Sequence, residues 1–110
     1  MKRVAVTGLG VISPVGNDVP TFWNALCSGT CGIGPITKFD ATDYPVKLAA
    51  EVRDFDPRQY MEKLDILHSD VYTHFAMAAA CQAVADSGIA GTLDSNSIVN
   101  KDMDVVAAYS

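Results

Sequence analysis

Basic side chains are scarce in this sequence. Lys and Arg together number 8 against 13 Asp and Glu, which gives a formal net charge of −5 at pH 7. A nucleic-acid-binding face needs concentrated positive charge to neutralise phosphates. The charge balance therefore argues against nucleic acid as a partner.

Long apolar runs are also lacking. No stretch approaches the roughly 18 residues that a membrane-spanning helix needs. At the N-terminus, Thr7, Gly8 and Gly10 interrupt the apolar pattern before it resembles the core of a signal peptide. Hydrophobic residues still make up 49% of the 110 residues, which is ordinary for a folded protein. We therefore expect a soluble cytoplasmic protein with no membrane partner.

Cysteine is limited to three residues, an odd number that suits reduced thiols in a cytosolic protein. Cys27 and Cys31 flank Gly29, but neither histidine stands at zinc-ligand spacing from them. We expect free thiols here and no metal site.

What the sequence does contain is a distinctive N-terminal stretch, VAVTGLGVISPVG, at residues 4–16. The apolar run from Val4 to Val6 predicts a short strand buried on both faces. Gly8 and Gly10 predict a turn in which the backbone either takes a positive φ or passes close to a neighbour. Pro14 disfavours helix at the residue before it, so an extended loop should precede the first helix.

The pattern Gly8-x-Gly10 also resembles the start of a dinucleotide-binding fingerprint. That fingerprint has a third glycine, and its helix opens at once so that the N-terminus faces the pyrophosphate. Here Ser13 holds the third position and Pro14 follows it. No second strand ending in Asp or Glu comes at the expected distance. The pattern favours a tight turn packed in a core, and we expect no nucleotide cofactor.

Apolar spacing predicts a first helix over residues 19–28. Asn17 or Asp18 can cap it, and its apolar stripe makes Phe22 and Trp23 core residues. A short helix should start at Pro57, with Asp56 as its N-cap, and run to about Lys63.

A long helix is predicted over residues 69–87, ending at Gly88. Most of its apolar stripe is alanine, so the helix can sit very close to its neighbour.

Residues 30–43 are predicted to form a loop. Tyr44–Val52 alternates as a half-exposed strand at a sheet edge or in a hairpin-like excursion. The positions expected to share one face are Val46, Leu48, Ala50 and Val52.

The run Val105–Ala108 predicts a second buried strand near the end of the chain. Two buried strands, an edge strand and two substantial helices indicate the α/β class. Parallel strands usually need cover on both faces and several neighbours. The sequence therefore reads as the opening of a larger α/β domain.

Several segments in order resemble one known family. VTGLGVISPVGN, followed by FWNAL, SG, GIGPITKFDATDYPVKLAAEV and FDP, is similar to the N-terminus of the beta-ketoacyl-acyl-carrier-protein synthases, most closely the type II elongation enzymes of bacterial fatty-acid synthesis. The resemblance runs from about Lys2 to about Gly88. It implies a thiolase-like fold and residues 1–110 as the N-terminal part of a synthase domain, truncated before the catalytic segments.

The resemblance also implies a chemistry. A cysteine takes the acyl group from its carrier as a thioester, malonyl-carrier loses CO₂, and the resulting carbanion attacks that thioester. Two histidines donate hydrogen bonds to the thioester oxygen and the developing enolate. In family members this Cys-His-His set lies beyond position 110, so we expect no catalytic residue in this chain and no activity from it alone.

Local candidates for catalysis are weak. Ala79-Ala80-Cys81-Gln82 superficially resembles the family's Thr-Ala-Cys motif, but Cys81 should lie in mid-helix with nothing basic beside it to lower its pKa. His68 and His74 are six residues apart, which puts them on different helix faces. We expect a structural cysteine and solvent-exposed or boundary histidines.

One departure from the family concerns its partner, the acyl carrier protein. The segment before the long helix usually carries several Lys and Arg residues that help dock the acidic carrier. Here residues 60–71 contain only Lys63, with Arg58 nearby. Lys63 is therefore the candidate docking residue, with weaker electrostatic steering than the family shows.

The sequence as a whole predicts the N-terminal portion of a cytoplasmic acyltransferase of fatty-acid biosynthesis, a homodimer that partners acyl carrier protein. Two alternatives stay open. One is a non-catalytic, chain-length-factor-like relative in polyketide or fatty-acid synthesis, which the residue at the downstream nucleophile position would distinguish. The other is a nucleotide-binding module, which binding of NAD or NADP would reveal.

Overall fold

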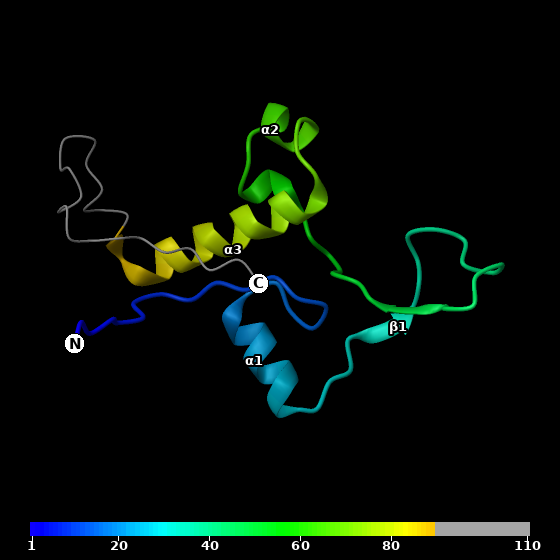
Figure 1. Ribbon diagram of the computed structural model, residues 1–110, viewed down its shortest axis with the longest axis horizontal. Helices are drawn as coiled ribbons and strands as arrows, with labels where there is room; N and C mark the ends of the chain where they lie inside the picture. The colour runs from blue at the N-terminus through cyan, green and yellow to red at the C-terminus, as the bar shows by residue number, and fades with distance from the viewer. Residues whose placement is uncertain (90–110) are drawn as a thin grey trace. The chain divides into compact units, whose positions relative to one another are not determined.

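The computed structural model describes residues 1–89, which belong to two compact units. One unit holds residues 1–10 together with the described residues from 57 onwards, and the other holds Val11–Asp56. The helices and strands, drawn in Figure 1, are α1 (Val19–Cys27), β1 (Ile33–Pro35), β2 (Leu48–Ala50), the 3₁₀ turn η1 (Pro57–Gln59), α2 (Lys63–Leu67) and α3 (Val71–Ser87). Within residues 1–89, no helix has the length and apolar character needed to cross a membrane.

Helix α1 begins where the sequence predicts. The carboxylate of its N-cap, Asp18, accepts a hydrogen bond of 2.8 Å from the backbone nitrogen of Thr21. This hydrogen bond lowers the pKa of Asp18. Pro20 falls in the first turn, where its missing N–H leaves no helical bond unmade. After the helix, Gly29 takes a φ of 69°, which suits a residue without a Cβ.

The apolar stripe of α1 lies on the surface of its unit. Trp23 is 62% exposed, and Phe22 is half-buried. The prediction that Trp23 is a core residue is therefore wrong for the described chain. A helix buries its stripe only against an opposing layer, and α1 is not among the described elements that pack extensively on another.

Strands β1 and β2 form an antiparallel hairpin-like pair, in which Ile33 lies opposite Ala50 and Pro35 opposite Leu48. This confirms the hairpin-like strand predicted within residues 44–52, although it is shorter. The prediction of loop throughout residues 30–43 is wrong at β1.

The more buried face of this pair is the one that carries Ala49. Leu48 and Ala50 are exposed, whereas Ala49 is half-buried. A Cβ added to Gly34, the partner of Ala49, would lie 2.9 Å from a guanidinium nitrogen of Arg53. The Arg53 side chain thus covers the face that carries Ala49. A two-stranded ribbon has no further layer to cover the other face.

The segment Val4–Val6 is not a strand in the described part of the chain. Val4 is 93% exposed and Val6 is 80% exposed, so the predicted burial on both faces is also wrong. A strand forms only against a hydrogen-bonded neighbour, and within residues 1–89 this segment pairs with none. The other predicted buried strand, Val105–Ala108, lies outside the described residues.

The prediction of a helix from Pro57 to about Lys63 is wrong beyond its first turn. Pro57 does begin a helical turn, but η1 ends at Gln59. The backbone nitrogens of Tyr60 and Met61 both donate to the carbonyl of Pro57, each at 3.0 Å, and this closes the turn. Helix α2 then starts afresh at Lys63.

Helix α3 confirms the predicted long helix to within two residues. Asp70 is its N-cap, and Gly88 follows its last residue with a φ of 73°. Its buried residues are His74 and Ala78, which are one turn apart on the same face. Burial of His74, which is only 8% exposed, contradicts the expectation of an exposed or boundary histidine.

Candidate functional site

Gly8 and Gly10 lie against the alanine-rich face of α3, and Figure 1 shows the N-terminal segment running alongside this helix. A Cβ on Gly10 would stand 2.8 Å from the backbone nitrogen of Ala83 and would overlap the carbonyl oxygen of Ala79. A Cβ on Gly8 would stand 2.6 Å from the backbone nitrogen of Ser87. Between them, the backbone nitrogen of Leu9 donates a 3.0 Å hydrogen bond to a carboxylate oxygen of Asp86.

This contact decides between the two predicted uses of the glycines. Among the described glycines, positive φ angles occur at Gly29 and Gly88 and not at Gly8 or Gly10. The close-approach alternative is therefore confirmed, and so is the prediction that the alanine stripe of α3 admits a very near neighbour. Ser13 and Gly16 next exchange backbone hydrogen bonds of 2.9 and 3.3 Å. Helix α1 starts only at Val19, so no helix opens directly after Gly10.

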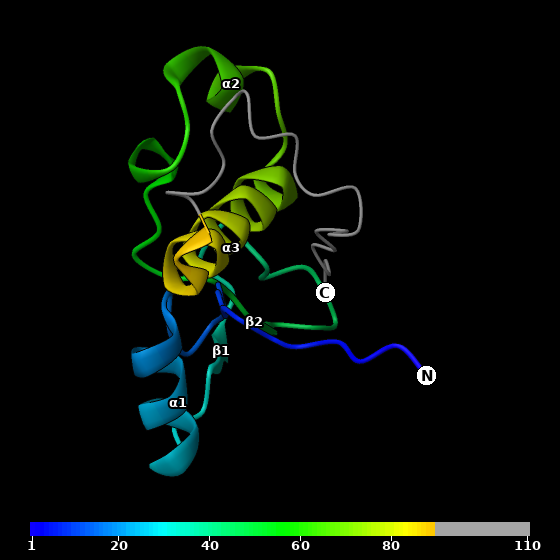
Figure 2. The same ribbon diagram turned by 90° about the vertical axis from the view of Figure 1, so that its left-hand side faces the viewer.

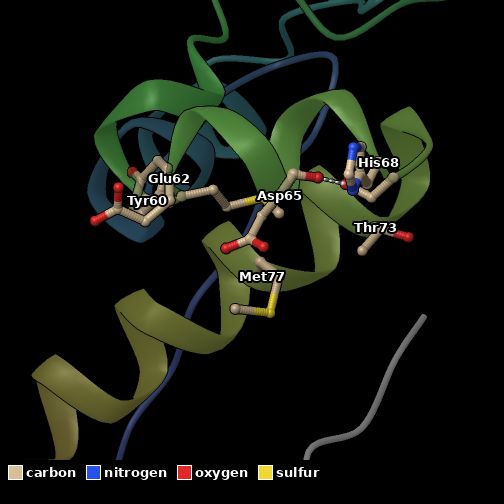
Figure 3. Close-up of a pocket in the computed structure, with 8 residues that line it drawn as sticks. Tyr60, Glu62, Asp65, His68, Thr73 and Met77 are labelled. Carbon is tan, nitrogen blue, oxygen red and sulfur yellow. Dashed lines mark hydrogen bonds between the residues drawn. The ribbon is translucent and has the colours of Figure 1, made fainter.

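A cavity of about 420 Å³ lies between α2, the short segments on either side of it and the first half of α3, and we call it the α2–α3 cavity. Figure 3 shows the Asp65 carboxylate and the Met77 side chain directed into the same space, with Tyr60 and Glu62 at one end and His68 and Thr73 at the other. Its lining residues are Tyr60, Met61, Glu62, Asp65, His68, Ser69, Thr73 and Met77. The cavity therefore combines apolar side chains with two carboxylates and an imidazole.

The candidate docking residue Lys63 is the first residue of α2 and is exposed. It stands next to Glu62 in the chain and two residues before Asp65, both of which line the α2–α3 cavity. Arg58, on η1, is also exposed. Both basic side chains therefore lie on the surface, and Lys63 is flanked in the chain by acidic residues that line the cavity.

Helix α2 has only five residues, and partners outside it hold its C-terminal carbonyl groups. The backbone nitrogen of His68 donates to the carbonyl of Leu64 at 3.1 Å. The Ser69 hydroxyl donates to the carbonyl of Asp65 at 2.5 Å.

The third partner comes from α3. Nε2 of His74 lies 3.2 Å from the carbonyl oxygen of Ile66. A carbonyl oxygen can only accept, so Nε2 carries the proton in this hydrogen bond. Sequence reasoning missed this role, because the bond depends on the contact between α2 and α3 and helical spacing does not reveal its partner.

The remaining candidates do not assemble into a reactive centre among residues 1–89. Cys81 lies in the middle of α3, as predicted, and its thiol is free and exposed. Cys27 and Cys31 are likewise free and exposed. His68 is exposed, as expected, and lines the α2–α3 cavity, whereas His74 is buried. Over the same residues, no group of three His, Cys, Asp or Glu side chains is arranged to hold a metal ion.

Comparison with known proteins identifies the family. The family described as "Beta-ketoacyl synthase, N-terminal domain" matches residues 1–109. This chain belongs to that family.

Individual relatives agree with this assignment. The chain is 51% identical over 88 residues to 3-oxoacyl-acyl-carrier-protein synthase 2 of Coxiella burnetii, which covers 80% of this chain and 21% of the relative. It is 45% identical over 86 residues to the protein of the same name from Synechocystis, covering 78% of this chain and 21% of the relative. A solved structure titled "The ishigamide ketosynthase/chain length factor" is 36% identical, with a TM-score of 0.69, and covers 76% of this chain and 21% of that one.

These matches confirm the fold class expected from the sequence, an incomplete α/β domain of the thiolase-like kind. They also show that the chain spans about a fifth of the length of the curated relatives it matches. That the catalytic residues lie beyond position 110, as the resemblance implies, stays a prediction.

Proposed function

We propose that this chain is the N-terminal portion of a cytoplasmic, homodimeric condensing enzyme that extends acyl chains held on acyl carrier protein. The observation that carries the proposal is the 51% identity, spread over 80% of the chain, to a 3-oxoacyl-acyl-carrier-protein synthase 2. The contact of Gly8 and Gly10 with α3 supports it, because it accounts for the glycine motif without a bound nucleotide.

The reaction has two linked steps. An acyl group passes from the carrier thiol to an enzyme cysteine, forming a thioester and releasing the carrier as a thiol. Malonyl-carrier then loses CO₂, and the electron pair of the broken bond becomes an enolate carbanion. This carbanion forms a carbon–carbon bond to the thioester carbonyl and expels the cysteine as a thiolate. No metal or nucleotide cofactor takes part.

In this scheme the described residues build part of the domain and help to bind the carrier. The N-terminal segment packs on α3, which builds part of the domain. Lys63 on α2, together with Arg58 on η1, would meet the acidic carrier from the surface. Nearby Glu62 and Asp65 oppose that attraction, so this face contributes weak steering, and most of the carrier affinity comes from elsewhere.

A second candidate is a non-catalytic, chain-length-factor-like partner subunit. This candidate is supported by the match to a structure whose title names both a ketosynthase and a chain length factor. In that case the subunit would sit beside an active synthase and would carry no nucleophilic cysteine.

Covalent trapping separates the two candidates. The full-length protein that carries this sequence is incubated with an acyl-carrier thioester, digested and analysed by peptide mass spectrometry. An acyl group on one cysteine beyond residue 110 supports the synthase. A folded protein that accepts no acyl group supports the partner subunit instead.

A further inference from the structure

We propose that His74 is a positioning residue: it holds α2, and with it Lys63 and the α2–α3 cavity, in the orientation that meets carrier-bound substrates. This inference rests on the proposed function, since it concerns the carrier-facing surface of the same enzyme. It assigns a task to a buried imidazole that the chemistry of condensation does not use.

The first step is that α2 cannot hold itself in place. A helix of five residues is far below the roughly 12 residues at which isolated helices become even marginally stable. It depends on contacts with other elements, and those are with η1, which in turn packs on α3. Figure 2 shows α2 at one end of α3, in agreement with Figure 1.

The second step concerns the carbonyl groups at the end of α2. The last four carbonyls of any helix lack partners within it. Two of them are bonded by the chain that immediately follows, from His68 and Ser69. The carbonyl of Ile66 is instead bonded by His74, eight residues further on in a different helix. This hydrogen bond therefore joins α2 to α3 directly.

The third step is that His74 is itself firmly placed. Its side chain is 8% exposed, and Ala78, one turn later on the same face, is completely buried. The imidazole therefore presents Nε2 from the buried face of α3. A hydrogen bond from a buried, restrained donor fixes the geometry of its acceptor better than one from a mobile surface side chain.

Loss of this hydrogen bond would alter the surface that α2 forms. Lys63 opens the helix whose end His74 holds, and Asp65 projects from the same helix into the α2–α3 cavity. Loss of the hydrogen bond frees α2 to shift on η1, which moves Lys63 and reshapes the cavity. If the catalytic residues lie beyond position 110, as the resemblance implies, the chemical step itself should be unaffected.

The test compares two forms of the same substrate with the full-length protein. Malonyl-carrier presents both the thioester and the carrier surface, whereas malonyl-coenzyme A presents the thioester without that surface. KM and kcat are measured for both, in wild type, His74→Leu, His74→Gln and Ala78→Gly. Glutamine retains a side-chain N–H that can donate to Ile66, while Ala78→Gly weakens α3 on the same face and leaves His74 in place.

We expect His74→Leu to raise KM for malonyl-carrier about fivefold to tenfold, with kcat and the KM for malonyl-coenzyme A changed by less than about twofold. His74→Gln should recover most of the loss. Ala78→Gly should lower the melting temperature without a selective rise in KM. If His74→Leu does not fold, His74→Asn serves in its place, because its amide is polar but too short to reach Ile66.

Three results would overturn the inference: equal effects of His74→Leu on both substrates, no recovery in His74→Gln, or the same selective rise in Ala78→Gly. Each of these leaves the proposed function standing, because the wild type still condenses its substrates. Failure of the wild type with both substrates would instead refute the proposed function itself.

Discussion

The backbone of Gly10 lies so close to Ala79 that a Cβ on residue 10 would overlap the Ala79 carbonyl oxygen. The contact joins the N-terminal segment to the middle of α3, and small residues on both sides make it possible. Gly8 repeats the arrangement one turn further along the helix, against Ala83 and Ser87. The glycines of this motif are thus explained by helix packing.

Gly10→Ala should therefore destabilise the full-length protein strongly. The added methyl would meet backbone atoms of Ala79 and Ala83, which cannot rotate away as a side chain can. We expect a loss of ~3 kcal/mol or more in the free energy of unfolding, at the upper end of overpacking effects. Chemical denaturation monitored by circular dichroism measures it.

The matched control is Gly29→Asn. Gly29 has open space around the position of a Cβ and a φ of 69°, a conformation that asparagine tolerates better than other residues with a side chain. Gly29→Asn should lower the free energy of unfolding much less than Gly10→Ala does. Equal stability of wild type and Gly10→Ala would show that the N-terminal segment does not pack on α3.

Cys81 should be dispensable for catalysis. It lies exposed in the middle of α3, away from the N-terminus of that helix, whose dipole could stabilise a thiolate. Cys81→Ala in the full-length protein should leave the rate of condensation near that of wild type. A loss of about a thousandfold, roughly 4 kcal/mol in transition-state stabilisation, in a variant that still folds would identify Cys81 as the nucleophile.

The cap of α1 should make a pH-dependent contribution to stability. The hydrogen bond from Thr21 lowers the folded-state pKa of Asp18 below its ordinary value of 3.8. The stabilisation is therefore complete above the unfolded-state pKa and is lost as pH falls through the lowered folded-state pKa. In the full-length protein, Asp18→Ala should lower the melting temperature at neutral pH, and its difference from wild type should shrink below about pH 4.

Differential scanning fluorimetry of wild type and variant from about pH 7 to about pH 3 measures this effect. Asp18→Asn is the control, since it keeps an acceptor for the Thr21 N–H and removes the charge. A gap between wild type and Asp18→Ala that stays constant down to about pH 3 would contradict a role for the ionised carboxylate.

Local chemistry accounts for most of what could be predicted from the sequence. Helix α1 follows from the Asp18 cap and Pro20, and the end of α3 follows from Gly88. The close approach to α3 follows from its alanine stripe. These features depend on neighbours within a few residues, or on side-chain size alone, and both can be read from sequence.

The wrong predictions depend on distant partners. The run Val4–Val6 was predicted as a buried strand because it is apolar, yet strand formation needs a hydrogen-bonded neighbour that the described residues do not supply. Trp23 is likewise predicted to be a core residue because it lies on an apolar stripe, yet it is exposed. The prediction for His74 is wrong in the opposite sense, since this residue is expected at the surface and is buried. Its burial and its bond to Ile66 arise from how α2 folds back on α3, which the spacing of residues in the sequence does not encode.

Residues 1–110 expressed alone should not form a stable, cooperatively folded monomer. Among the described residues only Ala78 and His74 are buried, while Val4, Val6 and Trp23 expose most of their apolar surface. Complete domains are stable by only ~5–15 kcal/mol, so a chain with so little described core should aggregate or stay dynamic. Amide hydrogen exchange and thermal melting check this, and a soluble monomer with a single sharp transition would refute it.

The condensation assay itself tests the proposed function most directly. The full-length protein and residues 1–110 alone are each supplied with an acyl-carrier thioester and malonyl-carrier, and CO₂ and product are quantified together. We predict one CO₂ released for each 3-oxoacyl chain formed by the full-length protein, and no product from residues 1–110. A folded full-length protein that forms no carbon–carbon bond, or product made by residues 1–110 alone, would contradict the assignment.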